Sequence, residues 1–197
     1  MTKTYDGKTV VVTGAGSGIG RATALAFAGR GARIVAADID TESASRTAAL
    51  AKALGAAAHP FTVDVAREES MAGFADEVAN LTDTPDVVVN NAGIGMVGSL
   101  LDTSPEAWER IVQINLGGVA RGCRLFGVQM VERGQGGHIV DLASAAGFTP
   151  NRAMAAYATT EARADHALSR LSPGTMRLMA RVDPTSRWKR EPKGRKS

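Results

Sequence analysis

The chain has 197 residues, of which 44% are hydrophobic and 22% are charged, so it predicts one domain with a sizeable core and excludes global disorder. No apolar run reaches about 18 residues, which excludes a membrane-spanning helix. The single cysteine, Cys123, excludes an internal disulfide framework, and the three scattered histidines indicate no metal site. Because the first residues lack an apolar stretch, we expect no signal peptide and a cytoplasmic location.

The net charge of +3 is distributed unevenly along the chain. Residues 1–161 carry 13 Lys and Arg against 17 Asp and Glu, whereas residues 162–197 carry 10 against 3. A basic C-terminal segment can bind nucleic acid or acidic lipid, or it can be a solvated, poorly folded tail. We favour the tail, and therefore expect no nucleic-acid partner and no membrane partner.

Segments with strand and helix patterns alternate along the chain. Short apolar runs predict strands at residues 9–13, 33–38, 61–63, 86–90 and 138–142. Apolar residues at helical spacing predict helices at residues 19–30, 41–54, 67–81, 105–134 and 155–171. The alternating residues 176–182 allow one edge strand, and the sequence after Pro184 predicts disorder.

This alternation predicts an α/β fold, a Rossmann-type doubly wound parallel sheet in a single domain. Strands that alternate with helices form right-handed crossovers, which place parallel strands in one sheet and helices on both of its faces. We expect five strands, with a sixth at the edge as an option, in a domain over residues 1–174. Residues 175–197 would then form the basic tail.

A glycine-rich turn joins the first predicted strand to the first predicted helix. Its sequence, Thr13-Gly14-Ala15-Gly16-Ser17-Gly18-Ile19-Gly20, is typical of turns that bring backbone amides and a helix N-terminus against a pyrophosphate. Asp38 ends the second strand, where a carboxylate can accept hydrogen bonds from an adenosine ribose and repels a 2′-phosphate. The turn therefore predicts a dinucleotide site that prefers NAD to NADP. Alternatively, Asp38 is only a strand-end turn residue, and Arg21 and Arg33 could weaken the preference.

Further motifs follow this turn in order along the chain. They are Asp64-Val65 after the third strand, Asn90-Asn91-Ala92-Gly93 after the fourth, Asn115 in the long helix, Ser144 after the fifth strand, and Tyr157. With the glycine turn, they make residues 7–160 resemble the short-chain dehydrogenase/reductase family. The resemblance implies one Rossmann-type domain that carries both the cofactor and the active site.

The resemblance also implies a role for each motif. Tyr157 would be the general acid/base, Ser144 would hydrogen-bond the substrate oxygen, and Asn115 would hold a proton-relay water through the helix backbone. Asn90 would steady the sheet and line the cofactor. The other implied cofactor-binding residues are Gly14, Ser17, Gly18, Ile19, Gly20, Asp38, Asp64, Val65, Asn91, Ala92, Gly93 and Tyr157. Two alternatives stay open, because Ser144 could be only a loop hydroxyl and Asn115 only a helix irregularity beside Gly117-Gly118.

Residue 161 departs from the family pattern. The family has Tyr-x-x-x-Lys at its active site, but this chain has Glu161 one helical turn after Tyr157, on the same face. The lysine binds the nicotinamide ribose and favours the phenolate of the tyrosine, and a glutamate has the opposite charge and disfavours the phenolate. At an effective dielectric of about 20, such a charge contributes roughly a few kcal/mol, which corresponds to orders of magnitude in rate.

We therefore expect an oxidoreductase that transfers hydride between NAD(H) and an alcohol or ketone substrate. We expect the activity of a chain with this sequence to be impaired. The competing hypothesis is a non-catalytic dinucleotide-binding or interaction protein derived from the same family. Because the pattern changes after residue 160, we hypothesise a family member truncated or altered in reading frame there. The resemblance implies a homo-oligomer, either a dimer or a tetramer, because the long helix and the helix that holds Tyr157 form the family's usual dimer surface. Pocket walls are expected at residues 95–97 and 146–154.

Overall fold

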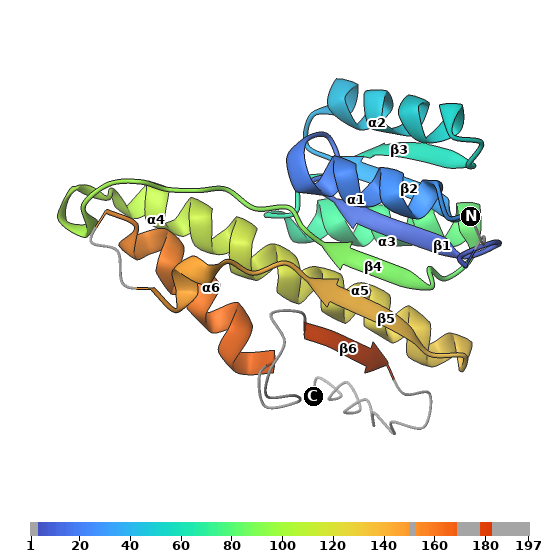
Figure 1. Cartoon of the computed structure of the whole chain (residues 1–197). Coiled ribbons are helices and arrows are strands. Elements are labelled where there is room, and N and C mark those ends of the chain that lie inside the picture. Colours follow the sequence, from blue (N-terminus) through green and yellow to red (C-terminus); the bar gives the residue numbers. More distant parts are fainter. Residues whose placement is uncertain (1–3, 150–152, 169–177, 183–197) are drawn as a thin grey trace.

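The computed structural model describes residues 4–149, 153–168 and 178–182, which form one sheet with helices on both faces (Figure 1). Its strands are β1 (Thr9–Thr13), β2 (Arg33–Asp38), β3 (Ala58–Thr62), β4 (Val87–Asn90), β5 (Gly137–Asp141) and β6 (Leu178–Val182). Its helices are α1 (Gly18–Ala28), α2 (Thr41–Ala53), α3 (Glu68–Thr82), α4 (Pro105–Val112), α5 (Gly118–Arg133) and α6 (Ala155–Leu168). The predicted order of elements is confirmed.

Two of the predicted elements differ in the structure. β3 covers residues 58–62 and runs through Pro60, whose missing amide is tolerated because β3 lies at the edge of the sheet. The helix expected over residues 105–134 is divided into α4 and α5 by a π-helical turn at Gln113–Gly117. The predicted disorder after Pro184 and the predicted boundary at residue 174 lie outside the described residues.

The strands lie in the order β3-β2-β1-β4-β5-β6. The first five are parallel, and β6, the expected edge strand, pairs antiparallel to β5. From β1 the chain moves to one side through β2 and β3, and it then returns to place β4 on the other side of β1. In doubly wound sheets, such a reversal opens a crevice at the carboxyl ends of the two central strands, where ligands bind.

The sheet separates two apolar cores. Val10 and Val12 on β1 face the core beneath α1 and α2, while Val11 faces the core beneath α3 and α5. This division follows from the period of two along a strand. The first core is rich in alanine, whereas the second holds large side chains such as Phe74 and Phe126, whose rings pack edge to face. Both faces of β1 are therefore buried, as its unbroken apolar sequence predicts.

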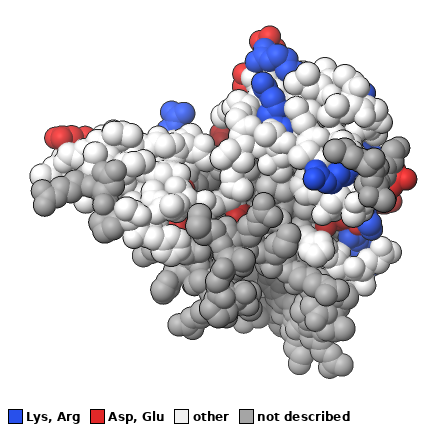
Figure 2. All heavy atoms as spheres, in the orientation of Figure 1, with Lys and Arg blue, Asp and Glu red and all other residues white. Residues whose placement is uncertain are grey.

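Apolar side chains are exposed near α4 and α6. Val97 is 77% exposed, Leu101 is 94% exposed and Phe148 is 65% exposed. Figure 2 shows few charged side chains over this lobe of the molecule. The homo-oligomer stays a prediction.

Asn90, at the end of β4, joins three elements. Its side-chain amide donates to Asp141 Oδ1 on β5 at 2.7 Å. The sulfur of Cys123, on α5, lies 3.6 Å from both oxygens of the same carboxylate. Burial raises the pKa of the Cys123 thiol to about 12, so Cys123 is a neutral packing residue. Asn90 thus steadies the sheet, as expected.

We expect Gly122→Ala to destabilise the protein, because α5 passes β4 at Gly122 with no room for a side chain. A Cβ there would lie 2.1 Å from Asn90 Oδ1, and Asp141 holds that side chain in place. The expected loss is about 1–3 kcal/mol in unfolding free energy, measured by chemical denaturation.

Gly127→Ala, on the same helix, is the matched control for this prediction. Its Cβ would lie 3.7 Å from Ile139 Cδ1, which is an ordinary contact. Alanine favours a helix over glycine by up to about 1 kcal/mol, so this variant should be neutral or more stable than the parent. Equal losses for the two variants would contradict the packing argument.

Candidate active site

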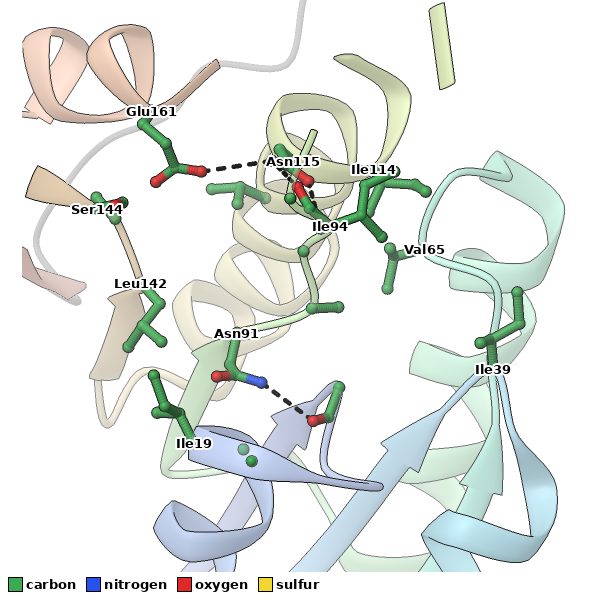
Figure 3. Close-up of a pocket in the computed structure, with 18 of the residues that line it drawn as sticks. Ile19, Ile39, Val65, Asn91, Ile94, Ile114, Asn115, Leu142, Ser144 and Glu161 are labelled. Atoms are coloured by element: carbon green, nitrogen blue, oxygen red, sulfur yellow. Dashed lines mark hydrogen bonds between the residues drawn. The ribbon is translucent and has the colours of Figure 1, made fainter. Parts of the chain in front are cut away.

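A cleft with a volume of about 840 Å³ opens at the carboxyl ends of the central strands. It lies where the winding of the sheet reverses, as expected for this topology. With the exception of Asn90, the predicted catalytic and cofactor-binding residues line it: Gly14, Ser17, Gly18, Ile19, Gly20, Asp38, Asp64, Val65, Asn91, Ala92, Gly93, Asn115, Ser144, Tyr157 and Glu161. Figure 3 shows several of them converging from different elements.

Some predicted positions do not line the cleft. Asn90, on which a cofactor contact was expected, is not among the lining residues in the described structure, because its side chain is held inside by Asp141. Of the expected pocket walls, Gly95 lines the cleft, whereas the described residues among 96–97 and 146–154 do not. Residues 150–152 lie outside the described structure.

The glycine turn packs tightly against the connection that follows β4. Gly14 has a φ of +64°, and a Cβ there would lie 2.8 Å from the Cα of Ala92. A Cβ on Gly20 would lie 2.1 Å from the carbonyl oxygen of Gly14. The turn can therefore be built only from glycine at these positions. It leaves the N-terminus of α1 at the cleft, where backbone amides and the helix dipole favour an anion.

Asp38 is fixed at the end of β2. Its Oδ2 accepts a hydrogen bond from the amide of Gly16 at 2.8 Å, and its Oδ1 accepts one from the amide of Asp40 at 3.0 Å. It therefore organises the turn, as the alternative interpretation expected, and it also lines the cleft. Each carboxylate oxygen has a second lone pair for a ligand hydroxyl.

The π-helical turn at Gln113–Gly117 presents Asn115 to the cleft. Asn115 is only 6% exposed, and its side chain forms a pair of bonds with Ile94. Its Oδ1 accepts from the Ile94 amide at 2.9 Å, and its Nδ2 donates to the Ile94 carbonyl at 3.0 Å. The expected helix irregularity is thus present, and it holds the connection after β4 against α6 through Thr160 and Glu161.

Ser144 and Tyr157 come from neighbouring parts of the structure. Ser144 precedes a short 3₁₀ helix, and its hydroxyl oxygen accepts a hydrogen bond from the amide of Ala146 at 3.2 Å. A Cβ on Gly147, in that short helix, would lie 2.8 Å from the amide nitrogen of Ala162 on α6. This close packing fixes the loop that carries Ser144 against the helix that carries Tyr157.

Glu161 is a buried carboxylate that lines the cleft, with 8% of its surface exposed. It accepts hydrogen bonds from the side chain of Asn115 and from the backbone amide of Ser144 (Figure 3 shows the first). Among the described residues, no Lys, Arg or His forms an ion pair with it. Burial outweighs the two hydrogen bonds and raises the pKa of the Glu161 carboxyl above its ordinary value.

Other lining residues carry no motif. They are Ile39, Val63, Ile94, Gly95, Arg110, Ile114, Val119, Leu142, Ala143 and Ala145. The position of Ile39 directly after Asp38 is a signal that sequence reasoning could have used, and the structure leaves 66% of its surface exposed. Arg110 gives no such signal, since it lies among polar residues on α4. It is nevertheless the one lysine or arginine among the described residues that line the cleft.

Two further features, a membrane-spanning helix and a metal-binding cluster, are absent from the residues that the structure describes. Their helices include none that is long and apolar enough to cross a membrane. Their His, Cys, Asp and Glu side chains form no group of three or more that could hold a metal ion.

We expect Glu161→Gln to change how stability depends on pH. Because the folded state raises the pKa of Glu161, the parent protein loses stability as pH rises from the unfolded pKa through the folded pKa. Glutamine keeps the hydrogen-bonding shape and cannot ionise. The variant should therefore gain stability over the parent as pH rises from about 4 towards 8, measured by urea unfolding at each pH.

Glu77→Gln is the control, since Glu77 is an exposed glutamate on α3. Its difference from the parent should stay flat over the same pH range. A flat difference for Glu161→Gln, or one that falls as pH rises, would contradict the account of Glu161.

Comparison with known proteins identifies the family of this chain. Residues 8–172 match the family model described as short chain dehydrogenase, so the match continues past residue 160. Over 159 residues the chain is 52% identical to the probable oxidoreductase EphD of Mycobacterium tuberculosis, and this match covers 80% of the chain and 27% of EphD. The chain thus spans about a quarter of that relative.

Solved structures show the same fold. The crystal structure of an NAD⁺-bound xylitol dehydrogenase matches with a TM-score of 0.81 and 31% identity, covering 85% of this chain and 65% of that one. A metagenomic short-chain oxidoreductase in complex with NADP matches with a TM-score of 0.80 and 31% identity, covering 84% of this chain and 75% of that one. These findings confirm the resemblance inferred from the motifs, and the chain belongs to the short-chain dehydrogenase family of oxidoreductases.

Proposed function

We propose that the cleft binds NAD(H) and is a site for hydride transfer between that cofactor and an alcohol or ketone. The observation that carries this proposal is the convergence of the predicted catalytic and cofactor-binding residues, Asn90 excepted, on one cleft. These residues are spread over about the first 160 positions of the chain, and independent surface turns would not bring them together. The substrate is a small molecule whose identity the lining residues leave open.

The residues present fit a dinucleotide. Gly14 and Gly20 let the turn pack closely on itself and on the connection after β4, and the N-terminus of α1 supplies positive electrostatic potential for a pyrophosphate. Asp38 would accept hydrogen bonds from the adenosine ribose, with Asp64 and Val65 beside the adenine. Both NAD and NADP are found in structures of similar chains. The charge of Asp38 favours NAD, because it repels the 2′-phosphate of NADP.

Two side chains and the backbone at a third residue would carry out the chemistry on the substrate. When bound, the nicotinamide supplies or accepts the hydride. Tyr157 would exchange a proton with the substrate oxygen, and Ser144 would donate a hydrogen bond to that oxygen as its charge changes. The bond from the Ala146 amide leaves the Ser144 hydroxyl proton available for this donation. Asn115 would support a water through the backbone of the π-helical turn, since Ile94, Thr160 and Glu161 already engage its side chain.

Glu161 supports a second candidate function, a dinucleotide-binding protein without turnover. A buried carboxylate without an ion-pair partner among the described residues stands where the family has a lysine. It opposes any negative charge that develops on Tyr157 or on the substrate oxygen. We therefore propose that hydride transfer is slow in this chain, while binding of the cofactor is retained at the glycine turn and Asp38.

Titration with NADH, followed by nicotinamide fluorescence, tests cofactor binding directly. We expect saturable binding, with NADPH at least about tenfold weaker because of Asp38. Asp38→Asn keeps the shape of the side chain and removes its charge. It should therefore reduce the difference in affinity between NADH and NADPH, while NADH still binds. Absence of saturation with both nucleotides would refute the proposed function. Tighter binding of NADPH than NADH by the parent protein would refute the assigned role of Asp38.

We expect Glu161→Lys to raise turnover by about tenfold to a hundredfold, because it reverses an unfavourable charge beside Tyr157. Oxidation of xylitol and of propan-2-ol with NAD⁺ would be followed by NADH absorbance. Glu161→Gln, which only removes the charge, should fall between the parent and the lysine variant. A lysine variant that is folded, binds NADH and is no more active than the parent would contradict the charge argument. Equal activity of all three proteins would leave Glu161 without a role in the rate.

A further inference from the structure

Arg121, on the first turns of α5, makes an unusual set of contacts. Its side chain is 17% exposed, and its guanidinium reaches two segments that are far apart in the sequence. One NH1 hydrogen bond goes to the carbonyl of Val65 at 3.1 Å, and another goes to the carbonyl of Gln113 at 3.2 Å. NH2 donates to the side-chain oxygen of Gln113 at 2.7 Å, and Nε lies 3.4 Å from Glu68 Oε2.

At one end, Arg121 supports the π-helical turn. In this turn the amide of Gly118 donates to the carbonyl of Gln113, five residues earlier, as well as to the carbonyl of Ile114, four residues earlier as in an α-helix. Such turns are rare, and they need partners that favour the altered backbone. Arg121 supplies one by bonding both the carbonyl and the side chain of Gln113. Asn115 lies in the middle of the turn that is held in this way.

Glycine at the end of the turn leaves space for the guanidinium. A Cβ on Gly117 would lie 2.6 Å from NH1 of Arg121 and 3.0 Å from Oε1 of Gln113. A Cβ on Gly118 would lie 3.0 Å from Cγ2 of Val65. The turn, the arginine and the Val65 segment therefore pack as one unit.

At the other end, Arg121 supports the loop between β3 and α3. Val65 lines the cleft next to Asp64, and Glu68 is in the first turn of α3. In Figure 3, Val65 and Asn115 come from different elements that border the same pocket. The guanidinium thus connects the backbone of the Asp64-Val65 loop to the backbone that presents Asn115. Lysine could keep the ion pair with Glu68, but it lacks the planar fork that reaches both carbonyls and the Gln113 side chain.

We propose that Arg121 is a positioning residue that couples the Asp64-Val65 loop to the π-helical turn carrying Asn115. Its effect on cofactor binding rests on the proposed function, whereas the coupling of the two backbone segments does not. When the hydrogen bonds of Arg121 are removed, we expect neither the Asp64-Val65 loop nor the π-helical turn to keep its position. Arg121 itself touches neither substrate nor reacting atoms.

Amide hydrogen exchange, measured on the whole chain without cofactor, tests the coupling. The reporters are the amide of Gly118 at the turn and the amides of Ala66 and Arg67, which bond to Asp64. In Arg121→Lys we expect exchange at both sites to become about tenfold faster, as the loss of a hydrogen bond to a charged group implies. Arg121→Met should accelerate exchange further at both sites.

Arg124→Met is the matched control. Arg124 lies one turn along α5 and forms an ion pair with the same Glu68, but in the described structure it bonds neither Val65 nor Gln113. It should leave exchange at Gly118 unchanged. If Arg121→Met does not fold, Arg121→Lys alone decides the question. Acceleration at only one of the two sites in Arg121→Lys, or equal acceleration in Arg124→Met, would overturn the proposal.

A second measurement separates this inference from the proposed function. If the parent binds NADH, we expect Arg121→Lys to weaken that binding by about tenfold and Arg124→Met to leave it unchanged. Unchanged NADH affinity in Arg121→Lys would overturn the proposed link to the cofactor. If the parent does not bind NADH, the proposed function fails, and the exchange experiment still decides whether Arg121 couples the two segments.

Discussion

Asn91 joins the two turns on which the cleft depends. Its side-chain amide donates to the carbonyls of Thr13 and Gly14, at 2.9 and 3.1 Å, and the hydroxyl of Thr13 accepts the amides of Asn91 and Ala92. These bonds cross between the ends of β1 and β4, where the sheet reverses its winding. They satisfy backbone groups that the strands no longer pair, and they hold the glycine turn against its neighbour. The rest of the cleft is arranged around this contact.

The charges around the cleft are unbalanced. Asp38, Asp64 and Glu161 line it, against Arg110 as the lysine or arginine among the described lining residues. At Asp38 a negative charge suits a ribose with free hydroxyls, and backbone amides hold the carboxylate in place. Under the proposed function, a negative charge at Glu161 would lie beside the proton donor, where it would oppose the reaction. The same chemical group would thus support binding at Asp38 and hinder turnover at Glu161.

The π-helical turn between α4 and α5 links the connection after β4 to α6. A continuous α-helix would place Asn115 differently, and the π-helical turn lets its side chain bond Ile94 while approaching Glu161. Arg121 holds the turn from one side, and Asn115 ties it to α6 on the other. The geometry of the cleft around Asn115 and Glu161 therefore depends on residues, such as Arg121, that do not line the cleft themselves.

Much of the fold and of the candidate site could be predicted from the sequence, because their signals are local. The apolar run Val10-Val11-Val12 indicates a strand buried on both faces, and the glycine turn needs conformations that few other residues allow. The ordered motifs indicated the family, and with it the residues that would meet in the cleft. Even the departure at Glu161 is visible in the sequence as a single changed residue four positions after Tyr157.

Only the tertiary structure decided how these parts constrain one another. Helical periodicity over residues 105–134 is nearly the same with or without one π-helical turn, so Gly117-Gly118 could indicate an irregularity beside Asn115 but not its π-helical form at Gln113–Gly117. The burial of Glu161 without an ion-pair partner in the described residues, and the bridge from Arg121 to Val65, depend on contacts between segments more than 40 residues apart. Such contacts follow from the order of the strands in the sheet. Sequence alone therefore predicted most of the motif residues that line the cleft, while packing determined their electrostatic environment.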